Sequence, residues 1–331
     1  MLNAYYDDQN ITLYHGDALA SLRQLGDGVA DCIVTSPPYF GLRDYEADGQ
    51  IGLEPTPVEY VDRLAAVFAE AHRVLADDGT MWLNLGDSYS TRPRGNDAGW
   101  DKSRLNNPGR VQKAQSAALR PRQFDRPPKS LLGVPWRVVF ALQDQGWILR
   151  NEIIWAKPNS LPESVKDRLA TRHERLFLLV KSERYWFDLD PIREPHAPAT
   201  LRRTAPHRAD PGRAAREGRG VPGGVDYQTL KLTQAMHTKG RNPGTVWTIP
   251  TQPFADAHFA TFPIELPRRC ILAGCRPGGT VLDPFSGTGT TGAAALANDR
   301  KYIGIDISET YLDLSIKARF PQPALPFGEV S

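Results

Sequence analysis

The sequence predicts a doubly wound α/β fold, in which a mostly parallel sheet carries helices on both of its faces. Apolar segments at residues 280–282 and 302–305 are typical of buried strands, and each is followed by an aspartate. A glycine-rich turn follows the first, and a third apolar strand at residues 32–34 ends in a proline-rich turn. Open α/β sheets bind ligands at the carboxyl ends of their strands, so these turns are expected to meet at one edge.

The other elements follow from apolar spacing along the chain. Alternation of apolar and polar residues at 10–17 is typical of a half-buried strand, and apolar side chains at helical spacing predict a helix over residues 57–75. Further strands are expected at residues 31–35, 80–85, 147–150, 152–155, 173–181 and 185–188. Further helices are expected at residues 18–25, 130–145, 264–273, 292–296 and 309–319.

The glycine-rich turn spans residues 283–291 and reads Asp-Pro-Phe-Ser-Gly-Thr-Gly-Thr-Thr. Its glycines allow the backbone to approach a ligand closely. A carboxylate at the strand end, with exposed backbone N–H groups at the start of a helix, suits a small polar ligand. Asp306 ends the next strand, at a spacing that fits a carboxylate gripping ribose hydroxyls. The alternative is a tight connection that binds nothing.

The proline-rich turn is Ser36-Pro37-Pro38-Tyr39. Two prolines fix the backbone and remove two N–H donors, which leaves carbonyl oxygens held rigidly beside the Ser36 hydroxyl. Such acceptors can bind the two hydrogens of an amino group, and the tyrosine ring offers a flat face for a base. The alternative is a proline turn beside a core tyrosine.

Together the two turns resemble those of the DNA amino-methyltransferases, which methylate the exocyclic nitrogen of cytosine or adenine. In that family an Asp-Pro-Phe-x-Gly-x-Gly-Thr-Thr stretch cradles the cofactor and a [Ser/Asp/Asn]-Pro-Pro-Tyr stretch holds the target base. The catalytic stretch comes first here, as in the permuted subgroup called beta. The resemblance implies a Rossmann-like methyltransferase fold, S-adenosyl-L-methionine as cofactor and double-stranded DNA as substrate.

The resemblance also implies which residues form the cofactor site. It places Asp17 against the adenine amino group, although the same aspartate is equally suited to cap the helix at 18–25. The full expected set is Asp17, Thr261, Phe262, Asp283, Phe285, Ser286, Gly287, Thr288, Gly289, Thr290 and Asp306. No metal ion is expected.

The expected catalytic residues are Ser36, Pro37, Pro38 and Tyr39. Serine at the first position goes mostly with N4 of cytosine in the family and aspartate with N6 of adenine, so cytosine is predicted and adenine is the alternative. A NAD-dependent oxidoreductase would explain the glycine turn but neither the proline turn nor the basic segments. An inactive DNA-binding relative is disfavoured because the residues of both turns are intact.

The charge distribution indicates a polyanionic partner. The formal net charge is only +2, yet residues 92–129 hold 10 Lys and Arg against 3 Asp and Glu, and residues 193–241 hold 10 against 4. The remainder is acidic, so DNA contacts are expected in these two segments. The alternative is that both are solvated loops. The expected DNA-binding residues are Arg43, Trp155, Arg202, Arg203 and Arg208.

These assignments divide the chain into four parts. Residues 1–91 and 130–190 form the expected catalytic half, residues 92–129 a basic DNA-contacting loop, residues 191–245 an inserted target-recognition region, and residues 246–331 the cofactor-binding half.

The composition sets the expected environment. Three cysteines without metal-ligand spacing predict a reducing, cytoplasmic compartment. No run approaches the ~20 apolar residues of a membrane span, and the first residues do not resemble a signal peptide. The sequence leaves open whether the chain forms a homodimer and whether a cognate restriction endonuclease accompanies it.

Overall fold

The computed structural model describes residues 3–42, 47, 49–90, 126–198, 200–201, 236–252 and 262–320. The chain divides into two compact units, one of Met1–Phe187 with Thr245–Ser331 and the other of Asp188–Gly244. Within the described residues, no helix has the length and apolar character that a membrane span requires.

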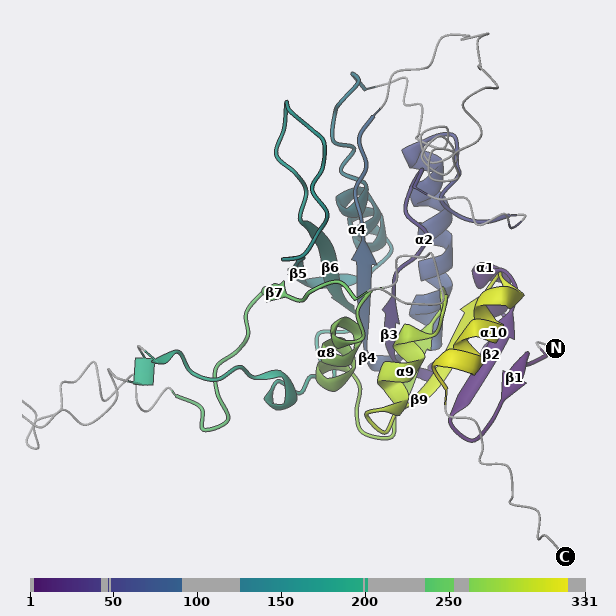
Figure 1. Ribbon diagram of the computed structural model, residues 1–331. Coiled ribbons are helices and arrows are strands. Elements are labelled where there is room, and N and C mark those ends of the chain that lie inside the picture. The colour runs from purple at the N-terminus through teal and green to yellow at the C-terminus, as the bar shows by residue number, and fades with distance from the viewer. Residues whose placement is uncertain are drawn as a thin grey trace, which may run out of the picture. The chain divides into compact units, whose positions relative to one another are not determined.

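The first unit is built on a mixed sheet, whose described strands run in the order β1-β2-β9-β8-β3-β4-β6-β5-β7 (Figure 1). The strands are β1 (Tyr6–Asp7), β2 (Ile11–His15), β3 (Ala30–Thr35), β4 (Leu75–Leu85), β5 (Ile148–Ala156), β6 (His173–Val180), β7 (Val246–Thr248), β8 (Thr280–Asp283) and β9 (Lys301–Asp306). Neighbours from β2 through β4 are parallel, whereas β6 is antiparallel to both β4 and β5.

The centre of the sheet joins strands that lie far apart in the sequence. Cys32 and Ile33 of β3 pair with Val281 and Leu282 of β8, in parallel. Because parallel neighbours end at the same edge, the turns after β3 and β8 begin side by side. The permuted order of the two turns along the chain therefore leaves them adjacent in space.

Two groups of helices cover the sheet (Figure 1). The first group, α1 (Ala18–Leu22), α2 (Pro57–Val74) and α4 (Val134–Asp144), packs in the order α1–α2–α4. The second group is α8 (Glu265–Gly274), α9 (Thr290–Leu296) and α10 (Glu309–Ala318), which contact the strands β2, β3, β4, β8 and β9. The doubly wound α/β fold predicted from the sequence is confirmed.

Helix α2 shows how local sequence fixes an element. Thr56 caps its N-terminus by accepting a hydrogen bond from the Glu59 amide at 3.2 Å, and Pro57 occupies the first turn. Its buried face includes Tyr60, Leu64 and Phe68, spaced four residues apart, so one stripe of the helix enters the core.

Several expected elements differ from the structure. The segments expected at 147–150 and 152–155 form one strand, β5, and the strand expected at 80–85 begins at Leu75. The helix expected at 130–145 begins at Val134, because Gly133 before it adopts a left-handed conformation with φ of 66°. The strand expected at 185–188 does not form. The Trp186 amide donates to the Asp78 carbonyl at 2.8 Å, and the Phe187 ring stacks on Trp82, so this segment contacts β4 through one backbone hydrogen bond and through side-chain packing.

The second unit contains a one-turn helix, η2 (Asp190–Ile192). The Asp190 carboxylate accepts hydrogen bonds from Arg193 at 2.7 Å and from Lys239 at 2.8 Å, and these two donors lower its pKa to about 2. Glu194 and Arg241 pair through a backbone bridge and an ion pair of 2.8 Å. These contacts connect residues near the beginning of the unit with residues near its end.

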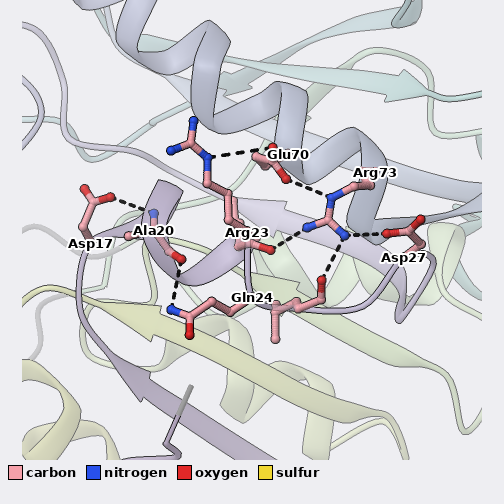
Figure 2. A network of polar contacts seen from close by, with 9 residues as sticks. Asp17, Ala20, Arg23, Gln24, Asp27, Glu70 and Arg73 are labelled. Atoms are coloured by element: carbon pink, nitrogen blue, oxygen red, sulfur yellow. Dashed lines mark hydrogen bonds and ion pairs between the residues drawn. The ribbon is translucent and has the colours of Figure 1, made fainter. Parts of the chain in front are cut away.

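Arg73 of α2 anchors the loop after α1 (Figure 2). Its guanidinium donates to the carbonyls of Leu22 at 2.8 Å and Leu25 at 2.9 Å, and it pairs with Asp27 and Glu70. It therefore supplies a donor to the Leu25 carbonyl beyond the helix end and a second donor to the Leu22 carbonyl, which also accepts from the Leu25 amide at 3.1 Å.

We predict that Arg73→Met destabilises the protein by about 1–3 kcal/mol, since the Leu25 carbonyl loses the Arg73 donor and the Leu22 carbonyl keeps only the Leu25 amide at 3.1 Å. The measurement is urea unfolding followed by circular dichroism. Arg23→Met is the matched control, because Arg23 is 63% exposed and lies 4.0 Å from Glu70. That control is expected to stay within about 0.5 kcal/mol. Equal losses in the two variants would contradict this role for Arg73.

Candidate active site

A cavity of about 600 Å³ opens at the carboxyl ends of the parallel strands. Segments from both ends of the chain line it, including residues 16–18, 36–39, 283–288 and 306–308. The proline-rich turn after β3 and the glycine-rich turn after β8 thus face one space. A cavity of this size accommodates a small organic ligand.

Asp283 connects the two turns. Its carboxylate is 1% exposed and accepts hydrogen bonds from the hydroxyls of Thr35 at 2.6 Å and Thr291 at 2.7 Å, and from the Phe285 amide at 3.0 Å. Burial raises its pKa to about 6, although these three donors oppose the rise. Because its oxygens are bound by the protein, Asp283 positions the turn.

The glycine-rich turn leaves polar atoms for a ligand. Gly287 adopts a left-handed conformation with φ of 52°, and the space around its Cα is open. The hydroxyls of Thr288 and Thr290 are buried at the cavity wall and have no hydrogen-bond partner among the described residues. A buried hydroxyl without a partner is costly, so both groups fit a ligand that supplies one.

Asp306, at the end of β9, is the second acidic group beside the glycine-rich turn. Its two oxygens accept hydrogen bonds from the amides of Gly287 at 2.7 Å and Ser308 at 2.9 Å. Each carboxylate oxygen can accept further hydrogen bonds, so capacity remains for hydroxyls in the cavity. Burial raises the pKa of Asp306 to about 6.

Asp17 caps α1, because its Oδ1 atom accepts a hydrogen bond from the Ala20 amide at 2.9 Å (Figure 2). The capping role considered from the sequence is confirmed. The same carboxylate lines the cavity, so its predicted contact with a ligand stays a prediction.

A hydrogen-bonded cluster begins at the proline-rich turn of the cavity. The Ser36 hydroxyl donates to the Tyr39 hydroxyl at 3.2 Å, which in turn donates to Glu174 Oε2 at 2.8 Å and lies 3.2 Å from Asn84 Oδ1. Lys157 forms an ion pair with Oε1 of Glu174. All five side chains line the cavity.

Packing holds the Tyr39 ring in place. A Cβ atom at Gly86 would lie 2.5 Å from the Tyr39 ring, so only glycine fits there. The Pro38 carbonyl accepts a hydrogen bond from the Tyr60 hydroxyl at 2.8 Å. Burial, assisted by the nearby Glu174 charge, raises the pKa of Tyr39 well above 10, which keeps its hydroxyl protonated.

A family comparison identifies the chain. Residues 30–317 match the model of a protein family described as DNA methylase. The chain belongs to the DNA methylase family. This match includes both turns that line the cavity, and it confirms the family resemblance seen in the sequence.

Individual relatives cover nearly the whole methylase. The type II methyltransferase M.Cfr9I of Citrobacter freundii is 45% identical over 309 residues, 92% of this chain and 86% of the relative. The PvuII DNA methyltransferase, described as cytosine-N4-specific, has a TM-score of 0.62 at 19% identity, over 98% of this chain and 91% of that one. The Thermus thermophilus protein TTHA0409, complexed with S-adenosyl-L-methionine, has a TM-score of 0.52 at 20% identity, over 92% and 91%. The Rossmann-like methyltransferase fold is confirmed.

The predicted site residues of the methylase are distributed as follows. The cavity is lined by Asp17, Ser36, Pro37, Pro38, Tyr39, Trp155, Phe262, Asp283, Phe285, Ser286, Gly287, Thr288, Thr290 and Asp306. Gly289 does not line it; this residue precedes α9 with φ of 74°, and a Cβ atom there would lie 2.7 Å from Ser315. Arg43, Thr261, Arg202, Arg203 and Arg208 lie outside the described residues, as does most of the basic segment at 92–129.

Trp155, expected from the sequence to contact DNA, is a buried residue that also lines the cavity. The side chain is 2% exposed, and its indole N–H donates to the Ile249 carbonyl at 2.8 Å, which is the pattern of a core residue. It nevertheless lines the cavity, and the Lys157 ammonium lies 4.2 Å from the centre of its ring. Its contact with DNA stays a prediction.

Sequence reasoning missed Glu174, Lys157 and Asn84 as cavity residues. Lys157 lies two residues after Trp155, which the sequence analysis had selected as a DNA-binding residue, so a signal was present. Asn84 is a polar residue, 2% exposed, near the end of the apolar strand β4. Nothing in the sequence distinguished Glu174 as a cavity residue, because charged residues are common at the start of strands.

We predict that Thr35→Val destabilises the methylase by about 1.5–3 kcal/mol at pH 7.5, because buried Asp283 loses a donor to its charged form. The Asp283 pKa lies above its unfolded value, so the penalty for its charge is present above pH 6 and is relieved as the pH falls below it. The deficit of the variant is therefore smaller at pH 5. Urea unfolding at both pH values measures it.

Thr12→Val on β2 is the matched control for this change. The Thr12 hydroxyl also donates to a carboxylate, that of Asp7 at 2.8 Å, but this pair is exposed. The control is expected to stay within about 0.5 kcal/mol at both pH values. A Thr35 variant that behaves like the control would show that the Asp283 link contributes nothing to stability.

Proposed function

We propose that this chain transfers a methyl group from S-adenosyl-L-methionine to the exocyclic N4 of a cytosine extruded from double-stranded DNA. The observation that carries the proposal is the Asp283 link, which holds the catalytic turn and the cofactor turn around one cavity. Membership of the DNA methylase family supports the reaction class. N6 of adenine is the alternative target.

The residues of the glycine-rich turn fit the cofactor. Asp306 would accept hydrogen bonds from ribose hydroxyls, and the unpartnered hydroxyls of Thr288 and Thr290 would meet its polar groups. Asp17 would accept from the adenine amino group. Bound there, the cofactor supplies an electrophilic methyl group on a sulfonium centre.

On the opposite wall, Ser36 would prepare the target amine. The lone pair of an exocyclic amine is delocalised into the base, so the nitrogen is a poor nucleophile. Acceptors at the Ser36 hydroxyl and the Pro37 carbonyl would bind the two amine hydrogens and favour a tetrahedral nitrogen with a localised lone pair. The Pro38 carbonyl is already bound by Tyr60, which leaves the Pro37 carbonyl for this role. The Tyr39 ring would stack on the extruded base.

The choice of cytosine rests on Ser36 and is supported by the likeness to the PvuII enzyme, whose description is cytosine-N4-specific. The DNA partner is supported by the type II methyltransferases among the relatives, and a cognate restriction endonuclease belongs to the same proposal. Residues 92–129 and 191–245 are proposed to hold the DNA, the second overlapping the separate unit at Asp188–Gly244.

The proposed reaction predicts a defined product. Incubation of the protein with S-adenosyl-L-methionine and DNA, followed by digestion to nucleosides and mass spectrometry, should reveal N4-methylcytosine. Detection of N6-methyladenine instead would select the alternative target. Absence of both, with folded protein that binds the cofactor, would refute the proposal.

Ser36→Ala is the accompanying variant. It should slow methyl transfer by about 10²–10³-fold, by analogy with the loss of one preorganised hydrogen-bonding group in a catalytic site. Cofactor affinity should be nearly unchanged, because Ser36 acts on the amine. Ser182→Ala is the control, since the Ser182 hydroxyl bonds the Asp77 carbonyl at 2.9 Å, outside the cavity.

The pKa of Asp306 predicts how cofactor binding depends on pH. Hydroxyl donors stabilise the carboxylate, so affinity should fall as the pH drops through about 6, where Asp306 becomes protonated. Binding should also release protons near that pH. Calorimetry from pH 5 to 8, in buffers of different ionisation enthalpy, measures both effects.

Asp306→Asn should weaken binding and remove most of this pH dependence. The matched control is Asp313→Asn, because Asp313 of α10 is bonded only to exposed Tyr5 among the hydrogen bonds described for it, and it does not line the cavity. The control should keep the pH profile of the wild type. An unchanged profile in Asp306→Asn would remove this residue from the cofactor site.

A further inference from the structure

Methylation of an exocyclic amine leaves a proton to be removed. The amine nitrogen gains a methyl group and becomes positively charged, and it returns to neutrality only when one N–H proton departs. A hydrogen bond to Ser36 orients the amine, but it does not identify the group that finally accepts the proton. This inference rests on the proposed function, in that it concerns the same amine and the same site.

The hydrogen bonds that lead from Ser36 through Tyr39 to Glu174 all have the same donor-to-acceptor direction. The Ser36 hydroxyl donates to the Tyr39 oxygen at 3.2 Å, and the Tyr39 hydroxyl donates to Glu174 Oε2 at 2.8 Å. Each hydroxyl therefore presents an acceptor toward the amine and a donor away from it. The series ends on a carboxylate, a group that can take up a proton.

We propose that Ser36, Tyr39 and Glu174 form a proton path that carries the displaced amine proton to Glu174. The amine lone pair forms the N–CH₃ bond while the S–CH₃ bond breaks, and its electron pair stays on sulfur. The amine proton moves to Ser36 Oγ, the serine proton to the Tyr39 oxygen, and the tyrosine proton to Glu174 Oε2. One proton leaves the amine and one arrives at Glu174.

The neighbours of Glu174 suit this role. Lys157 pairs with Oε1, which leaves Oε2 as the oxygen that faces Tyr39. The Glu174 side chain is 20% exposed and lines the cavity, so the proton has a route to water. Asn84 also accepts from Tyr39, but its amide is no base, and its Nδ2 atom donates to the Arg175 carbonyl at 3.1 Å.

Neither hydroxyl of the path has to ionise. Each one accepts a proton as it gives one up, so serine and tyrosine stay neutral before and after the transfer. This agrees with the Tyr39 pKa, which burial raises well above 10 and which disfavours a free tyrosinate. Glu174 thus acts through Tyr39 and Ser36 and does not touch the amine.

The competing explanation is that Glu174 only fixes the Tyr39 ring for stacking. The two roles differ in what the hydroxyl must do. Tyr39→Phe keeps the ring and the close packing against Gly86 but removes the hydroxyl, and Glu174→Gln keeps a hydrogen-bond acceptor but removes the base. If Glu174 only positions the ring, both variants should transfer the methyl group at nearly the wild-type rate. If the three residues form a proton path, both variants should be slow.

The experiment measures single-turnover methyl transfer with saturating cofactor and DNA, together with the affinity for each. Tyr39→Phe and Glu174→Gln should each slow transfer by about 10²-fold, within the range of general acid–base catalysis, and leave both affinities nearly unchanged. Glu163→Gln is the control with wild-type rate, because Glu163 pairs with Arg168 at 2.6 Å and does not line the cavity.

Chemical rescue separates a base from a structural group. Formate added to Glu174→Ala should restore transfer in proportion to its concentration, whereas chloride at equal ionic strength should not. Wild-type rates in Tyr39→Phe and Glu174→Gln, or slow variants without formate rescue, would overturn the path. If the wild-type protein itself methylates no base, the proposed function fails; active wild type with unaffected variants overturns only the path.

Discussion

The structure of the site depends on one buried carboxylate. Asp283 ends β8, yet it receives hydroxyl donors from Thr35, at the end of β3, and from Thr291 in α9. Burial raises its pKa to about 6 even though these donors oppose the rise, so the charged form stays disfavoured by roughly 3 kcal/mol after their contribution. Only a fixed set of donors makes such a charge tolerable, so the two turns must keep their mutual geometry. The glycine-rich turn and the proline-rich turn, proposed to hold the cofactor and the base, are thereby kept in a fixed relative position.

This constraint also explains why the order of the turns along the chain is unimportant. Strand β8 lies beside β3 in a parallel pair, although some 250 residues separate them. The register between Ile33 and Leu282 brings Thr35 level with the start of the glycine-rich turn. Any chain order that preserves this pair would present the same cavity. The site is a property of the sheet edge, which is what open α/β folds provide.

Much of this arrangement was predictable from the sequence, because the position of these residues depends on their immediate neighbours in the chain. Asp283 and Asp306 end apolar strands and Ser36 follows one directly, so each is placed by its neighbours in the chain. Glu174 and Asn84 are not, because they meet only through the antiparallel pairing of β6 with β4, and no pattern within either strand reveals that register. The strand expected at 185–188 failed for a related reason. Its aromatic residues pack by their side chains against β4 without a backbone ladder, and propensity cannot separate the two arrangements.

The charges that line the cavity favour binding of the cofactor there and binding of DNA by other parts of the chain. Four carboxylates line it, those of Asp17, Glu174, Asp283 and Asp306, against the single ammonium of Lys157 among the described lining residues. An acidic cavity attracts a cationic sulfonium but repels phosphate. We therefore expect DNA to be held by charges elsewhere, and half of all Lys and Arg lie in residues 92–129 and 193–241. Among these carboxylates, Glu174 is the one that accepts a hydrogen bond from Tyr39, whereas Asp283 and Asp306 accept from amides of the glycine-rich turn. A proton that ends on Glu174, as proposed, would therefore leave the hydrogen bonds of the glycine-rich turn unchanged.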